Sequence, residues 1–145
     1  MIDQGRSLAL AESYYLVGDR SHAAGLARTI SSHIEGERHD RPDPYAGPAE
    51  AYLFGGRPND ARRVAKLRLE STPLKLDALD YWTARKELAR VCAMLGDTDE
   101  ALTLLKLVQH GPRPDCGNEL RLEPMFVSLR GDAWFEGLAA KSDWK

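Results

Sequence analysis

The chain repeats one short pattern three times, and this repeat constrains the fold more than any single residue does. In each copy a small residue, an aromatic residue or cysteine, a glycine and an alanine recur at the same spacing. The copies are Ala11, Tyr14, Gly18 and Ala23; Ala49, Tyr52, Gly56 and Ala61; and Ala89, Cys92, Gly96 and Ala101. They are offset by 38 and 40 residues at all four positions. Units of this length are too small to bury an apolar face alone, so the period predicts units that stack on one another.

Apolar residues follow helical spacing on both sides of each glycine. In the first copy Leu8, Ala11 and Tyr14 form one stripe, and Ala23 and Ile30 belong to a second stripe after the break at Gly18. Glycine suits the positive φ that ends many helices. We therefore expect an all-α chain with three helix hairpins at residues 7–35, 46–70 and 77–110.

The C-terminal residues predict a cap for the last hairpin. Residues 120–145 contain a set of large apolar side chains at helical spacing and one proline: Pro124, Phe126, Leu129, Trp134, Phe135 and Leu138. A stack of repeats needs such a segment to cover the apolar face that its last unit leaves exposed. We expect a capping helix within 120–145, and one domain that spans residues 1–145.

Composition excludes several classes of function. The chain has 20 Lys and Arg against 22 Asp and Glu, so its net charge of −2 offers no general attraction to nucleic-acid phosphates or to anionic membranes. No apolar run approaches the roughly 20 residues of a membrane helix, and the N-terminus lacks the features of a secretory signal. Cys92 and Cys116 are expected as reduced thiols. We predict a cytoplasmic protein that binds neither nucleic acid nor membrane.

The spacing of the repeat resembles that of the tetratricopeptide repeat, most clearly at residues 88–102. The tail resembles the closing segment of such arrays at the C-terminal ends of bacterial signalling proteins and transcription regulators, through Leu122, Glu123, Pro124, Phe126, Leu129, Arg130, Asp132 and Phe135. The resemblance implies a right-handed superhelix of three hairpins plus a C-terminal capping helix. It also implies a non-catalytic scaffold that binds a protein or peptide partner, without a cofactor.

In this family the first helix of each hairpin lines a concave groove that holds a peptide or helix. Carried over to this chain, the groove positions are Leu8, Glu12, Tyr15, Leu16, Glu50, Leu53, Phe54, Lys86, Arg90 and Met94. Acidic residues at one end and basic residues at the other suit a dipolar amphipathic segment. The competing interpretation is that the charges are solvated and that the aromatic residues pack between helices. The asparagine-and-lysine clamp that grips acidic chaperone tails is not expected, because Leu8, Glu12 and Glu50 occupy its positions.

The sequence is also compatible with two functions other than a peptide-binding groove. The first helix is apolar and no cap precedes it, which favours either a missing upstream neighbour or a homodimer contact through this helix. The loop that carries His33 and His39 is the basis for the other alternative, a small enzyme or metal-binding protein. The four histidines do not show the ligand spacing of a known metal motif, and no nucleophile elbow or phosphate loop is present. We predict no catalytic residue and no metal ligand.

Overall fold

The structure, a computed structural model, describes residues 3–36, 49–72, 78–111 and 117–140. Within these ranges the regular structure is helical and contains no strand, which confirms the all-α fold. The chain divides into two compact units, Met1–Ser71 and Thr72–Lys145, called unit 1 and unit 2 below. None of the helices in the described ranges is long and apolar enough to cross a lipid bilayer.

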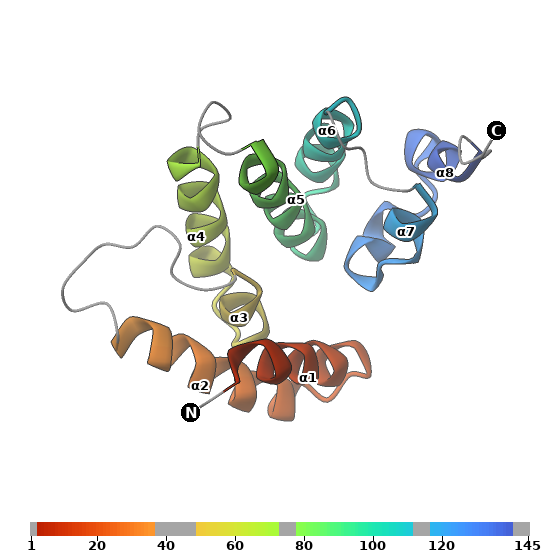
Figure 1. Cartoon of the computed structure of the whole chain (residues 1–145). Helices are drawn as coiled ribbons and strands as arrows, with labels where there is room; N and C mark the ends of the chain where they lie inside the picture. Colours follow the sequence, from red (N-terminus) through yellow and green to blue (C-terminus); the bar gives the residue numbers. More distant parts are fainter. Residues whose placement is uncertain (1–2, 37–48, 73–77, 112–116, 141–145) are drawn as a thin grey trace. The chain divides into compact units, whose positions relative to one another are not determined.

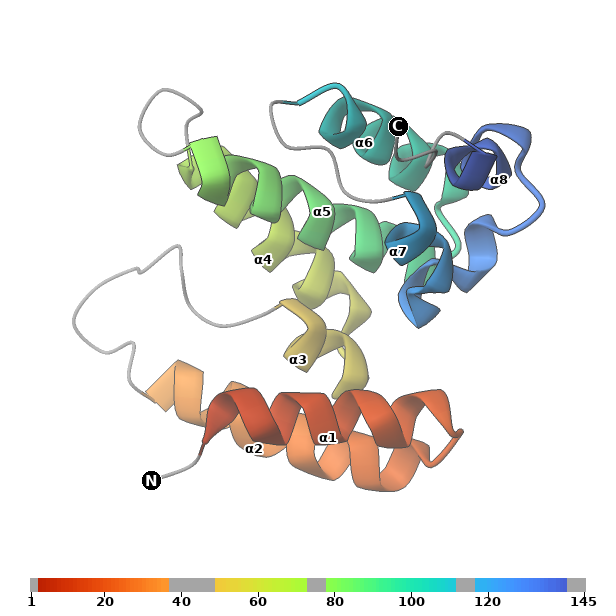
Figure 2. The ribbon, with the colours of Figure 1, turned by 45° about the vertical axis from the view of Figure 1, so that its right-hand side comes forward.

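Unit 1 contains two helix hairpins. Its helices are α1 (Gln4–Leu16), α2 (Arg20–Gly36), α3 (Ala49–Phe54) and α4 (Pro58–Ser71). α1 and α2 lie side by side in Figures 1 and 2, and α3 packs on both of them as well as on α4. The second hairpin therefore stacks on the first, as the repeat predicts.

Small repeat residues form the centre of unit 1. Ala11, Ala23, Ala49 and Ala61 are all completely buried, so the backbones of paired helices can approach closely. Beside them Ile30, Ile34 and Ala51 form an apolar cluster, and Leu8 packs against it.

Unit 2 contains one long hairpin and a C-terminal segment. The hairpin consists of α5 (Ala78–Met94) and α6 (Thr98–Gln109), and the segment consists of α7 (Gly117–Leu122), the 3-10 helix η2 (Pro124–Leu129) and α8 (Ala133–Ala140). η2 packs on α5 and on α6, while α7 packs on α8 and η2. Phe126 and Phe135 are completely buried and contact each other edge to face, with ring centroids 6.3 Å apart.

The cap therefore consists of three short pieces rather than of one helix. Pro124 begins η2, where its missing N–H is tolerated but where α7 cannot continue. Gly131 has a φ of 97° and separates η2 from α8. Asp132 then caps α8, because its Oδ1 accepts a hydrogen bond from the backbone N–H of Phe135 at 3.0 Å.

The three repeat glycines end the first helix of each hairpin in the same way. Gly18, Gly56 and Gly96 have φ values of 88°, 79° and 85°. In each case the residue after the glycine donates its N–H to the carbonyl five positions earlier, at 2.9, 2.8 and 2.9 Å. This is the hydrogen bond of a Schellman motif, and it explains why the glycine recurs at a fixed place in the repeat.

Candidate functional site

Tyr15, one of the predicted groove residues of α1, lies on the side of this helix that meets α3. The Tyr15 ring packs against the Phe54 ring, with centroids 4.9 Å apart and planes tilted by 45°. Glu12 lies one turn before Tyr15 and is partly exposed, and Leu16 leaves 44% of its surface exposed. These residues of α1 thus remain accessible to a partner.

Arg20 belongs to the same surface, and sequence reasoning missed it. It is the first residue of α2, and its guanidinium carbon lies 3.4 Å from the centre of the Tyr15 ring. The signal for this contact is weak in the sequence, because it depends on how the Gly18 turn brings α2 back beside α1. We call Glu12, Tyr15, Leu16 and Arg20 the Tyr15 patch.

The charge of Arg20 is not neutralised by its acidic neighbour in the chain. Asp19 caps α2 by accepting the backbone N–H of His22, and its Oδ2 lies 2.7 Å from Nδ1 of His22. The backbone hydrogen bond from His22, followed by the bond to its ring, lowers the pKa of the Asp19 carboxyl. In the described ranges no carboxylate forms an ion pair with Arg20, and none of the cationic groups there pairs with Glu12.

The predicted groove residues of α3 are buried. Glu50, Leu53 and Phe54 keep only 8%, 6% and 3% of their surface exposed. Every residue of this short helix is buried, since α3 contacts α1, α2 and α4. Leu53 and Phe54 therefore contribute mainly to packing in this structure, and the Tyr15 ring covers part of Phe54.

The predicted groove residues of α5 contact the C-terminal segment of the chain. Arg90 donates a hydrogen bond from Nε to Oε1 of Glu123, and Nζ of Lys86 lies 4.0 Å from Oε2 of the same carboxylate. The Glu123 side chain is only 17% exposed. One turn beyond Arg90, Met94 is partly buried, and nearby the Ser128 hydroxyl donates to the carbonyl of Ala93 at 2.8 Å. The two basic groups are thus engaged within unit 2.

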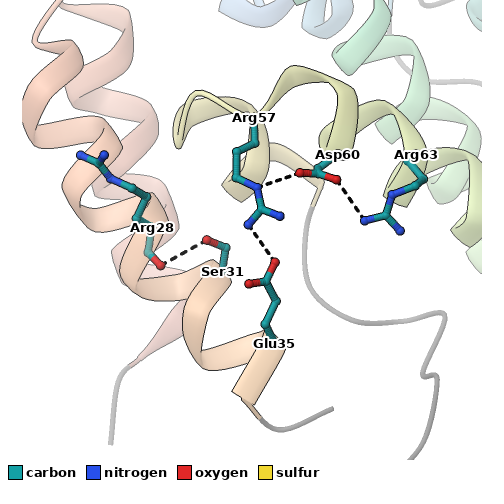
Figure 3. A network of polar contacts seen from close by, with 6 residues as sticks. All are labelled: Arg28, Ser31, Glu35, Arg57, Asp60 and Arg63. Atoms are coloured by element: carbon teal, nitrogen blue, oxygen red, sulfur yellow. Dashed lines mark hydrogen bonds and ion pairs between the residues drawn. The ribbon is translucent and has the colours of Figure 1, made fainter. Parts of the chain in front are cut away.

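A second polar network in unit 1 was also missed from the sequence (Figure 3). The Arg57 guanidinium donates to Glu35 of α2 at 2.8 Å and to Asp60 of α4 at 2.7 Å, and Asp60 also accepts from Arg63 at 3.1 Å. Glu35, and then Asp60, raise the pKa of Arg57, while Arg57, and then Arg63, lower the pKa of Asp60. The i,i+3 spacing of Arg57 and Asp60 is visible in the sequence, but the partner 22 residues away is not.

The predicted histidine loop is only partly within the described ranges. His33 lies exposed in the last turn of α2, whereas His39 and Cys116 lie outside the described residues. Within residues 3–36, 49–72, 78–111 and 117–140, no group of three or more His, Cys, Asp or Glu side chains could hold a metal ion.

Residues 84–106 match a family model described as tetratricopeptide repeat. This segment is similar to a tetratricopeptide repeat. It covers most of α5 and α6 as far as Lys106, including the third copy of the repeat pattern around Gly96. No curated protein and no solved structure matches the chain.

The match supports the resemblance to a tetratricopeptide repeat that the sequence shows at residues 88–102. Tetratricopeptide repeats are generally non-enzymatic units that bind proteins, which supports a protein-interaction scaffold. The assignment of Glu12, Tyr15, Leu16, Glu50, Leu53, Phe54, Lys86, Arg90 and Met94 to a binding groove stays a prediction.

Proposed function

We propose that the chain is a non-catalytic scaffold that holds a peptide or helix of a protein partner, and that α1 of unit 1 provides the principal binding surface. The observation that carries the proposal is the Tyr15 patch. It combines an aromatic ring, an exposed aliphatic side chain and one acidic residue of α1 with the Arg20 guanidinium at the start of α2. Surfaces with an aromatic residue and an arginine at their centre are typical protein-binding hot spots.

The α5 face is a poorer candidate for the same role. A partner there would have to replace Glu123 beside Arg90 and Lys86. It would also meet η2, which packs on α5 and whose Phe126 is completely buried. Displacing these contacts costs more free energy than binding to an open face.

The tail residues support a wider context for this scaffold. Their resemblance to the closing segment of bacterial repeat arrays supports a role as the C-terminal module of a bacterial signalling or transcription regulator. The partner would then be a cytoplasmic protein. A homodimer through the first helix would use the same surface, and we treat it as a competing outcome.

The test is a selection of random twelve-residue peptides displayed on phage against the purified full chain. We expect enriched peptides to bind in solution and to slow hydrogen exchange in α1. Leu16→Asp should weaken their binding, whereas Leu107→Asp, at an equally exposed leucine of α6, should not.

Failure to enrich any peptide, or protection confined to unit 2, would contradict the proposal. Size-exclusion chromatography with light scattering tests the dimer. A dimer that Leu16→Asp converts to monomer would replace the peptide as the occupant of α1.

A further inference from the structure

We infer that the partner segment carries a carboxylate next to an aliphatic side chain, and that Arg20 and Leu16 recognise this pair. The inference rests on the proposed function and specifies the chemistry of the partner. It follows from three features of the Tyr15 patch, which are the orientation of Arg20, the absence of a local counter-charge and the exposed leucine beside them.

Stacking on Tyr15 holds the Arg20 guanidinium in place before any partner arrives. At 3.4 Å from the ring centre, the planar group lies directly against the aromatic face. Its N–H donors lie in its own plane, and a guanidinium held this way can present two of them to one carboxylate. Less side-chain entropy is lost on binding than for an arginine that moves freely in solvent.

The electrostatics favour an acidic partner at this point. Arg20 is exposed and, within the described ranges, has no ion pair, while Asp19 is engaged by His22. Arg57, Arg63, Arg90 and Arg121 differ from Arg20, since each pairs with a carboxylate of this chain. Arg20 therefore keeps its hydrogen-bonding capacity for another molecule.

Leu16 and Glu12 define the rest of the recognised segment. Leu16 lies next to Tyr15 on α1 and is 44% exposed, so an aliphatic side chain of the partner can cover it. Glu12 lies on the same helix face, one turn toward the N-terminus of α1, and has no cationic partner within the described ranges. A basic residue of the partner near Glu12 would complement this charge and fix the direction in which the segment binds.

The experiment measures which chemical group of the peptide Arg20 contacts. The probe is the most enriched member of the twelve-residue phage library, made as a fluorescein-labelled peptide and titrated with the full chain by fluorescence anisotropy. The variants are Arg20→Gln and, as a matched control on the same helix, Arg28→Gln. Arg28 is also exposed, and its Nε donates to the carbonyl of Ala24 at 3.1 Å.

We expect the selected peptide to contain Asp or Glu next to an aliphatic residue. Arg20→Gln should raise its Kd by about tenfold or more, as for loss of a hydrogen-bonded charge pair. Arg28→Gln should change Kd by less than about twofold. Replacing the acidic residue of the peptide by its amide should cause the same loss in the parent and little further loss in Arg20→Gln, because both changes remove one interaction.

Three results would overturn the inference, and they differ in what they mean for the proposed function. Peptides that bind α1 but whose Kd is unaffected by Arg20→Gln would contradict the carboxylate contact and leave the proposed function intact. Selected peptides without acidic residues would do the same. A library that yields no binder to α1 would contradict the proposed function itself, and the inference with it.

Discussion

Arg57 contacts residues of α2, α3 and α4 in unit 1 through a single side chain. It follows the Gly56 turn, and from there its guanidinium reaches Glu35 at the end of α2, Asp60 in the first turn of α4 and, at 5.0 Å, the ring of Tyr52 in α3. The side chain is 40% exposed, so water weakens each of these contacts. The network thus links α2 to the second hairpin but contributes little to the free energy of unfolding.

Replacing Arg57 should therefore have a small effect. We expect Arg57→Gln to lower the free energy of unfolding by less than about 1 kcal/mol, because the ion pairs are partly exposed. Urea unfolding at low salt measures this loss, and a double-mutant cycle with Glu35→Gln isolates the contact between α2 and the turn. In 1 M salt the coupling should largely vanish. A coupling that is insensitive to salt would contradict this account.

Replacement by alanine should change the stability differently at a turn glycine and at a glycine inside a helix. Gly96→Ala places a side chain at a φ of 85°, which costs about 1–2 kcal/mol for an L-residue. Gly25 lies within α2, and a Cβ there would meet no atom within 4 Å. Gly25→Ala should instead stabilise the chain by about 0.5–1 kcal/mol. Thermal unfolding of the two variants checks the opposite signs, and equal signs would contradict the role of the turn.

At the scale of elements, the C-terminal segment packs as an integral part of unit 2. η2 contacts α5 and α6, and the neighbouring Glu123 pairs with Arg90 and Lys86 of α5. Leu120, Phe126 and Phe135 are completely buried. The segment therefore completes the core of the hairpin that matches the tetratricopeptide repeat.

Truncating one buried side chain of this segment should destabilise unit 2. We expect Phe126→Ala to lower the free energy of unfolding by about 3–5 kcal/mol, through lost burial and the cavity left behind. Hydrogen exchange followed by mass spectrometry should show faster exchange in α5 as well as in η2. Val127 is 54% exposed, so Val127→Ala serves as the control in the same helix and should change little. Unchanged exchange in α5 would show that η2 does not support the hairpin.

At the scale of the whole molecule, both units contain carboxylates whose pKa is lowered in the folded chain. Hydrogen bonds from His22 lower the pKa of Asp19, and Arg57 with Arg63 lowers that of Asp60, both in unit 1. In unit 2 the backbone N–H of Gly131 lowers the pKa of Glu136, with a further contribution from Arg121. The ordinary values are 3.8 for Asp and 4.5 for Glu.

These shifts predict loss of stability in acid. A carboxylate with a lowered pKa in the folded state stabilises the fold when both states are ionised, and this contribution is lost as protons bind the unfolded chain first. The melting temperature should therefore fall as the pH drops below about 5. The triple variant Asp19→Asn, Asp60→Asn and Glu136→Gln should show a flatter dependence. Glu119→Gln, at an exposed glutamate of α7, is the control and should follow the parent.

The sequence alone determined the hairpins, because their causes are local. Glycine at the αL position, alanine at the closest helix contact and apolar residues at helical spacing each act within one unit of the repeat, so their pattern could be recognised without coordinates. The observed helices begin and end within about three residues of the expected hairpins, an offset usual for helix ends. The division of the cap into α7, η2 and α8 was not predicted. The breaks at Pro124 and Gly131 are local, but the packing of η2 depends on α5 and α6, which lie earlier in the chain.

Only the tertiary structure decided which side chains remain available to a partner. The repeat pattern predicts groove positions at Glu12 and Tyr15 in α1, Glu50 in α3 and Arg90 in α5. In the structure Glu50 is buried, and Arg90 pairs with Glu123, 33 residues further along the chain. Arg20 was missed for the same reason, since its contact with Tyr15 forms across a turn. Burial and charge pairing depend on contacts between residues distant in sequence, whereas the periodicity of a repeat records only the local ones.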